Sequence, residues 1–209
     1  MGDVAVGARA TRRESTLYGI ERVALGLFLE RGFDVVTAEQ IASSAGISVR
    51  TFYRYFPEGK EGVLLLETRR GFDLFLQALR ARPPQERADV AVAGAALESV
   101  RLLYHPADPE LAIGLLEARA LYRHIESSNS ALAARLIGER VLMLEPLVDL
   151  VALRMSVDPL VDPRPRLLVH VADAAITAAW FTAQRNPSLD PIASLAQQLD
   201  VLARGFAAA

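Results

Sequence analysis

The sequence of 209 residues is 52% hydrophobic and 23% charged, with a formal net charge of −2 and no cysteine. This composition excludes a disordered or fibrous chain, and the length suits a small module joined to a larger body. The lack of cysteine excludes disulfides, thiolate metal sites and cysteine nucleophiles, and the three histidines lack the close spacing of a zinc site. With no signal peptide and no long apolar run, we expect a soluble, cytoplasmic protein without a metal or other cofactor.

Capping signals predict two helices in the first part of the chain. The first helix is expected to begin after Thr11, which forms a capping box with Glu14, and to end at Gly32. A second capping box, formed by Thr37 and Gln40, opens a short helix that runs to about residue 45.

A sharp turn and a third short helix follow. The turn is Ala45-Gly46-Ile47-Ser48, in which Gly46 can adopt a left-handed backbone and Ser48 can cap the next helix. That helix is predicted over 49–55, and Pro57 ends it. Two short helices joined by a glycine-containing turn are typical of a helix-turn-helix, which places its second helix in the major groove of DNA.

The third helix has two different faces. Phe52 and Phe56 lie four residues apart and should face the core, while the outer and flanking faces carry Val49, Arg50, Thr51, Tyr53, Arg54 and Tyr55. Arginine can bridge guanine in the major groove, and hydroxyl groups can reach phosphates. The alternative is that an aromatic helix is simply core. That alternative accounts for the two phenylalanines, but less well for tyrosines on other faces beside two arginines.

The rest of the chain is also read as helical. Helices are predicted at about 60–79, 86–103, 110–124, 130–154, 165–185 and 191–206. Pro146 should kink the helix over 130–154, and Asp190 should cap the last helix, with Pro191 at its first position. The sequence therefore predicts an all-α fold of about nine helices, with a DNA-binding module over 1–59 and a helical body over 60–209.

Residues 12–66 resemble the N-terminal domain of TetR-family regulators. The matching features are residues 24–33, Thr37 with Ile41-Ala42, the turn 45–48, and the stretch 51–57 followed by Lys60-Glu61. One feature departs from the family pattern, because Glu58-Gly59 stand where the family usually has a single residue. That extra residue leaves open whether Lys60 keeps the phosphate contact that the resemblance implies.

The resemblance implies a homodimer with two DNA-binding heads that bind a near-palindromic duplex operator. By position, it implies base-groove contacts for Val49, Arg50 and Tyr53, phosphate contacts for Thr37, Ser48, Thr51, Tyr55 and Lys60, and either role for Arg54. In this family the last two helices pair with those of the partner as a four-helix bundle. Here the candidates for that surface are Ala172, Ala174, Ala175, Ala178 and Ala179, with an apolar stripe over 192–206. The alternative is a monomer that buries both stripes internally.

The body is expected to bind a small apolar effector. It is rich in leucine, valine and alanine, which suits an apolar cavity with a few polar anchors. The stretches 81–83 and 162–168 resemble a TetR subgroup with an acyl-CoA-like ligand-binding C-terminal domain. Candidate ligand contacts are Arg119, Tyr122, Arg123, His170, Asp173 and Trp180, although His170 also suits a packing role.

The rival interpretation is an all-helical enzyme or carrier. The sequence has no paired carboxylates in a recognisable frame, no glycine-rich phosphate loop and no supported Ser–His–Asp order. The favoured hypothesis is a non-enzymatic, ligand-responsive repressor that a lipophilic effector releases from its operator. An activator remains open, because the sign of regulation depends on where the operator lies.

Overall fold

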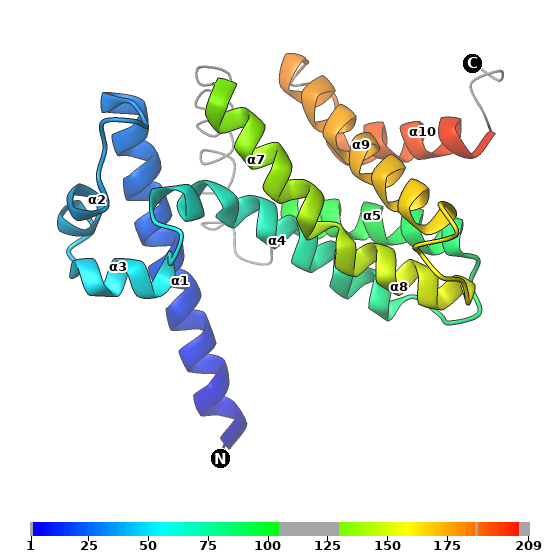
Figure 1. The fold of residues 1–209 in the computed structure, drawn as a ribbon, viewed down its shortest axis with the longest axis horizontal. Helices are drawn as coiled ribbons and strands as arrows, with labels where there is room; N and C mark the ends of the chain where they lie inside the picture. The colour runs from blue at the N-terminus through cyan, green and yellow to red at the C-terminus, as the bar shows by residue number, and fades with distance from the viewer. Residues whose placement is uncertain (1, 105–129, 187, 205–209) are drawn as a thin grey trace. The chain divides into compact units, whose positions relative to one another are not determined.

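The computed structural model describes residues 2–104, 130–186 and 188–204, and the regular elements within these ranges are all α-helices (Figure 1). The all-α prediction is therefore confirmed. Two compact units make up the chain. Among the described residues, the first unit contains residues 2–68 and 130–137, and the second contains residues 69–104, 138–186 and 188–204. The predicted boundary at residue 60 divides DNA binding from effector binding, and it stays a prediction.

The first unit is built on α1 (Gly2–Arg31), α2 (Ala38–Ser44), α3 (Val49–Tyr55) and the start of α4 (Lys60–Ala81). Helix α1 packs against α2, and α2 packs against α3, as Figure 1 shows. The core of this unit is apolar, and its largest fully buried side chains are Ile20, Leu25, Ile41, Phe52, Phe56 and Leu64. The three N-terminal helices form in the predicted order because each buries one apolar face against the next.

Helix α1 begins earlier than the sequence predicted. The expected start after Thr11 is wrong, because the helix already runs from Gly2. A capping box requires an extended backbone at its first residue, whereas Thr11 lies inside the helix. The alanines and arginines of residues 5–13 are strong helix formers, so nothing in this stretch forces the helix to stop.

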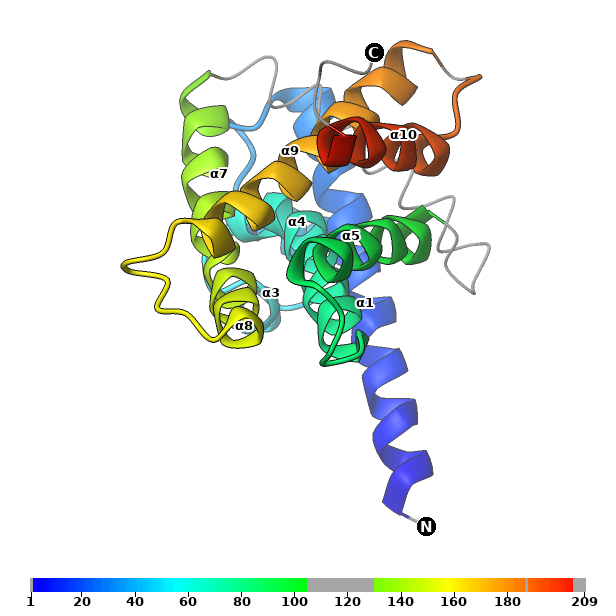
Figure 2. The same ribbon diagram turned by 90° about the vertical axis from the view of Figure 1, so that its right-hand side faces the viewer.

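The second unit contains the rest of α4 together with α5 (Ala88–Tyr104), α8 (Glu145–Met155), α9 (Arg164–Arg185) and α10 (Pro191–Arg204). Helix α9 packs against α5, α8 and α10, and α10 also packs against α5 (Figure 2). The predicted start of the last helix is confirmed, because the Ile192 amide donates to the Asp190 carboxylate at 3.0 Å. Helix α9 is thus the central element of this unit.

The predicted helix over 130–154 is two helices. Helix α7 (Ser130–Met143) ends just before Leu144, and α8 begins at Glu145 with Pro146 in its first turn. Proline has no amide hydrogen, and its ring clashes with the carbonyl four residues earlier, so the helix ends and restarts at this point. The predicted helix over 110–124 lies outside the described residues. Over the described ranges, no helix is both long enough and apolar enough to cross a membrane.

Candidate nucleic-acid interface

Helix α2 begins at the capping box that the sequence predicted. The Gln40 amide donates to the Thr37 hydroxyl at 3.3 Å, and the Thr37 amide donates to the Gln40 side chain at 3.0 Å. The carboxylate of Glu39 also lies in this first turn, and its pKa is lowered by its own backbone amide and then by the Thr37 hydroxyl. The hydroxyl of Thr37 therefore already has a structural role at the point where the sequence predicted a phosphate contact.

The turn between α2 and α3 depends on the left-handed backbone of Gly46. Its φ angle is +66°, a conformation that glycine adopts without the steric penalty of a side chain. The amides of Ala45 and Ile47 donate at 2.9 Å to carbonyls of Ile41 and Ala42, and these bonds close the end of α2. The chain then leaves in the direction that lets Ser48 start α3.

Helix α3 is capped by Ser48 and anchored by two phenylalanines. The Ser48 hydroxyl accepts from the Thr51 amide at 3.1 Å, as the sequence predicted. Phe52 and Phe56 are fully buried, and their ring centroids lie 5.4 Å apart. This pair fixes the rotation of α3 about its own axis, so it decides which side chains face outward.

The remaining side chains of α3 are exposed or half-buried. Val49 and Tyr53 have exposed fractions of 37% and 45%, and Arg50 and Arg54 are also exposed. Thr51 and Tyr55 are half-buried at the edges, with the guanidinium of Arg54 5.3 Å from the Tyr55 ring centre. The structure therefore groups the predicted residues from Ser48 to Tyr55 on one short, polar and basic ridge.

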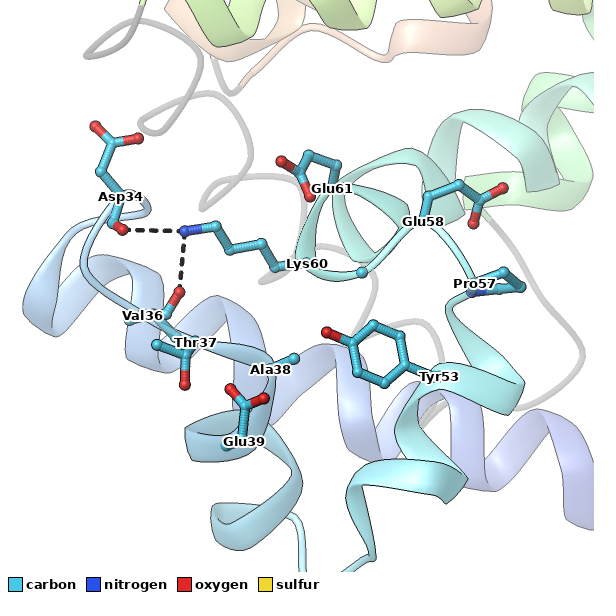
Figure 3. Close-up of a pocket in the computed structure, with 11 residues that line it drawn as sticks. Asp34, Val36, Thr37, Ala38, Glu39, Tyr53, Pro57, Glu58, Lys60 and Glu61 are labelled. Atoms are coloured by element: carbon cyan, nitrogen blue, oxygen red, sulfur yellow. Dashed lines mark hydrogen bonds between the residues drawn. The ribbon is translucent and has the colours of Figure 1, made fainter.

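Lys60 lies at the start of α4 and has different partners from those predicted. Its ammonium donates to the backbone carbonyls of Phe33, Asp34 and Val36 at 2.6, 3.1 and 3.0 Å. Figure 3 shows the bonds to Asp34 and Val36. It also lies 4.5 Å from the centre of the Phe33 ring. The predicted phosphate contact stays a prediction, but in this structure the charge points at the loop between α1 and α2.

An open hollow of about 510 Å³ lies beside this contact, between the start of α2 and the start of α4. Its rim carries Asp34, Glu39, Glu58 and Glu61, with Tyr53 on the side of α3 (Figure 3). Carboxylates repel phosphate at close range. Because Lys60 is the only cation among its lining residues, the hollow carries more negative than positive charge.

Only part of the predicted effector site lies within the described residues. Arg119, Tyr122 and Arg123 fall outside them, and the side chain of Trp180 on α9 is not among those described. His170 and Asp173 both lie on α9 and are half-buried. The structure therefore places three of the six candidates, His170, Asp173 and Trp180, on one helix, and the effector site as a whole stays a prediction.

Asp173 has a partner that the sequence did not predict. Arg140 of α7 donates to both oxygens of its carboxylate, at 2.6 and 3.2 Å, and also to the Thr177 hydroxyl at 2.5 Å. The two charged residues are 33 positions apart, and no local motif joins them. Sequence reasoning missed Arg140 because only the tertiary structure brings its side chain from α7 to this carboxylate on α9.

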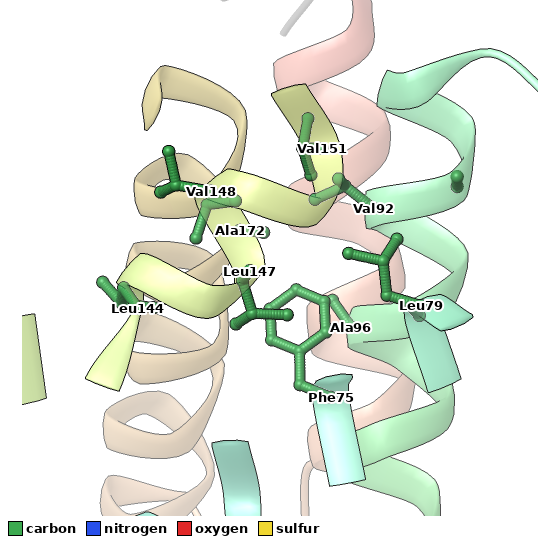
Figure 4. Packing of buried hydrophobic residues seen from close by; sticks show 12 residues of the cluster. Phe75, Leu79, Val92, Ala96, Leu144, Leu147, Val148, Val151 and Ala172 are labelled. Atoms are coloured by element: carbon green, nitrogen blue, oxygen red, sulfur yellow. The ribbon is translucent and has the colours of Figure 1, made fainter. Parts of the chain in front are cut away.

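The second unit has a well-filled apolar core. Phe75 and Leu79 from α4 pack with Leu144, Leu147, Val148 and Val151 from the α7–α8 region, as Figure 4 shows. Of the five alanines predicted to meet a partner chain, Ala172, Ala175 and Ala179 are buried in this chain's own clusters. Ala174 and Ala178 remain exposed. The predicted small-residue surface is therefore divided between the chain's own core and solvent.

Two family models match the chain. A model described as "Bacterial regulatory proteins, tetR family" matches residues 20–66, which span α2, the turn and α3. A second model, described as the MftR C-terminal domain, matches residues 116–207. The first match covers the ridge of α3 described above.

Individual proteins extend this likeness. The HTH-type transcriptional regulator TcmR of Streptomyces glaucescens is 33% identical over 178 residues, which cover 84% of this chain and 77% of TcmR. The crystal structure of NalD, the secondary repressor of the MexAB-OprM multidrug efflux pump in Pseudomonas aeruginosa, is similar with a TM-score of 0.50 and 22% identity. That likeness covers 92% of this chain and 95% of NalD, and it shows the fold. PfmR, a TetR-family regulator from Thermus thermophilus, has a TM-score of 0.44 at 18% identity, covering 89% of this chain and 97% of PfmR.

Proposed function

The chain belongs to the TetR family of bacterial transcription regulators, and on that premise we propose that it is a repressor that a small lipophilic effector releases from its operator. Its relatives are regulators, so the chain is a DNA-binding transcription regulator and not an enzyme. The proposal adds the sign of regulation, the residues that read DNA, the dimer surface and the class of effector.

The proposed DNA-binding role of α3 rests on the difference between its buried face and its exposed face. Phe52 and Phe56 are fully buried, whereas Arg50, Tyr53 and Arg54 are exposed on the same short helix. A helix whose buried face is anchored by two aromatic rings can enter the major groove without losing its orientation. This supports a rigid reading element rather than a helix that is merely packed.

We assign base-edge contacts to the outermost side chains of the ridge, which are Val49, Arg50 and Tyr53. Phosphate contacts fall to the hydroxyl groups at its edges and at the start of α2, which are those of Thr37, Ser48, Thr51 and Tyr55. Arg54 can take either role, because its guanidinium is exposed near the Tyr55 ring. Arginine can donate two parallel hydrogen bonds to guanine, so Arg50 is expected to contribute most to sequence preference.

Replacing Arg50 with alanine tests this assignment. The operator can be selected from a randomised duplex pool by the wild-type protein, and binding is then measured by titration. Arg50→Ala should cost about 1–3 kcal/mol on the selected duplex and relax specificity at one base pair in each half-site. The matched control is Arg101→Ala, because Arg101 is an exposed arginine on α5, and it should leave binding unchanged. Equal affinities for Arg50→Ala and wild type would remove the base-reading role.

A homodimer through residues 165–206 is supported by the exposed side of α9. Leu167, Ala174 and Ala178 are exposed and recur at intervals of seven and four residues, so they share one helical face. A two-fold dimer would bind a near-palindromic operator. Light scattering should report a dimer for the wild type and a monomer for Ala178→Arg. A monomeric wild type at micromolar concentration would contradict the proposal.

A lipophilic effector is supported by the composition of the body and by its resemblance to acyl-CoA-like ligand-binding domains. The carboxylate of Asp173 is already neutralised by Arg140, which reduces the number of free polar anchors on α9. The experiment is a titration of acyl-CoAs, fatty acids and apolar drugs into the protein–DNA complex. A coupling of about 1–3 kcal/mol would weaken DNA binding 5- to 150-fold, and a flat response across all three classes would remove the effector class.

A further inference from the structure

The ammonium of Lys60 is saturated by the protein itself. It has three hydrogens, and the structure gives each of them a backbone carbonyl, those of Phe33, Asp34 and Val36, at 2.6 to 3.1 Å. The contacts to Phe33 and Val36 are partly shielded from water, and the ring of Phe33 covers the charge. A lysine in this arrangement has no hydrogen left for a phosphate unless one of these bonds breaks.

The three carbonyls belong to the loop that joins α1 to α2. Phe33 contacts Phe28 near the end of α1, with ring centroids 5.0 Å apart. Val36 is fully buried and directly precedes Thr37, the N-cap of α2. One side chain from the first residue of α4 therefore holds the end of α1 and the start of α2 together.

The preceding glycine sets the direction from which Lys60 leaves the chain. The Gly59 amide donates to the Phe56 carbonyl at 3.0 Å, and Gly59 has a φ angle of +72°. This left-handed residue is part of the Glu58-Gly59 pair, which is one residue longer than the pattern usual in similar sequences. The extra residue is accommodated by a turn that only glycine adopts without strain.

From this geometry we infer that Lys60 is a positioning residue for the DNA-reading helices and does not contact DNA itself. The inference rests on the proposed DNA-binding function and names one residue that controls it. We call the three bonds from Lys60 to the carbonyls of Phe33, Asp34 and Val36 the clamp. The clamp links the start of α4 to the loop before α2, and α2 packs directly on α3. Because the same helix α4 continues into the second unit, the clamp lies where a movement of α4 would reach the reading helices.

The salt dependence of DNA binding separates positioning from phosphate contact. Affinity falls as salt rises, and the slope here means the steepness of that fall in a plot of log affinity against log salt. Each lost phosphate contact lowers this steepness by about 0.9, or by about 1.8 for a dimer with two heads. The variants are Lys60→Met and Arg54→Met, which each remove one positive charge and keep an unbranched side chain of moderate length. Binding is measured on the wild-type-selected duplex over a range of KCl concentrations, at a temperature where both variants are folded.

We expect Lys60→Met to weaken binding about tenfold or more while leaving the salt slope unchanged. Arg54→Met, whose guanidinium is exposed on α3, should lower the slope. Hydrogen exchange of the amides at residues 33–41 should accelerate in Lys60→Met and not in Arg54→Met. A fall in slope of about 1.8 for Lys60→Met, or unchanged affinity in a folded protein, would overturn the inference.

A second variant tests the inference if Lys60→Met does not fold. Lys60→Arg keeps the charge but replaces a compact ammonium with a flat guanidinium, which cannot aim three hydrogens at three converging carbonyls. Positioning therefore predicts weaker binding for Lys60→Arg with an unchanged slope. A phosphate contact would tolerate arginine, so full affinity would overturn the inference. A wild-type protein that selects no duplex would instead remove the proposed DNA-binding function.

Discussion

The reading helices and helix α9 organise their polar side chains in different ways. At the starts of α2 and α3, the hydroxyl of the N-cap residue accepts from an amide three residues ahead, as Thr37 does from Gln40 and Ser48 from Thr51. On α9, the carboxylate of Asp173 depends on Arg140, which is 33 residues earlier on another helix. The first region is a local structure, and the rings of Phe52 and Phe56 anchor its buried side. The second exists only when two helices far apart in the sequence come within reach of one side chain, so a single substitution should affect the two regions differently.

The largest expected effect is the loss of the aromatic support under α3. Phe52→Ala removes a fully buried ring that packs against Phe56, and it should cost about 3–5 kcal/mol of folding free energy. Operator binding should disappear, because the ridge loses its orientation. Denaturant unfolding followed by circular dichroism measures the change. Leu147→Ala, at a fully buried position in the core of the second unit, should cost a comparable amount.

The two variants together sharpen the comparison. If the two units unfold separately, Phe52→Ala should lower the denaturant midpoint of the first unit, and Leu147→Ala should lower that of the second unit. A Phe52→Ala protein with unchanged stability and full DNA affinity would contradict the role assigned to the aromatic pair.

A smaller effect is expected at the ion pair of α7 and α9. Asp173→Asn keeps the shape of the side chain but removes the charge that faces the Arg140 guanidinium, so it should destabilise the fold by about 1–3 kcal/mol. Thermal unfolding is the measurement, and Asp73→Asn at an exposed position of α4 is the control. If Asp173→Asn weakens effector release and leaves stability unchanged, Asp173 belongs to the effector site and not to the packing of α9.

The smallest effect is the dependence of stability on pH. Hydrogen bonds from Arg166 lower the pKa of Glu145, and those from Arg164 lower the pKa of Asp162. A carboxylate with a lowered pKa in the folded state stabilises the protein above its unfolded pKa, and this contribution is lost as the pH falls through the folded pKa. Stability should therefore decline below about pH 4.

The decline should be shallow, because these pairs are partly exposed and water weakens them. Urea midpoints measured from neutral pH down to about pH 3, below the usual carboxyl pKa range, provide the test. Arg166→Met should lower stability near neutral pH and reduce the acid-induced loss that Glu145 contributes. A midpoint that rises on acidification would contradict the assigned direction.

Much of the first unit could be predicted from the sequence, because the signals that define it are local. The capping box at Thr37, the glycine turn at Gly46 and the cap at Ser48 all act within a few residues along the chain. The spacing of Phe52 and Phe56 likewise determines which face of α3 is buried. The same local reasoning failed at Thr11, where a capping pattern lies inside a continuous helix. An N-cap pattern alone cannot set the start of a helix when the residues before it also favour a helix.

The sequence by itself therefore determined the helical fold, the bounds of α3 and which of its side chains face outward, because hydrogen bonds between near neighbours and helical periodicity depend on consecutive positions. Only the tertiary structure decided the partners of Lys60, which lie 24 to 27 residues earlier, and the pairing of Arg140 with Asp173. It also decided that Ala172, Ala175 and Ala179 are buried within the chain while Ala174 and Ala178 face solvent. These outcomes depend on how helices pack against one another, and periodicity along one helix does not specify which neighbour covers each face.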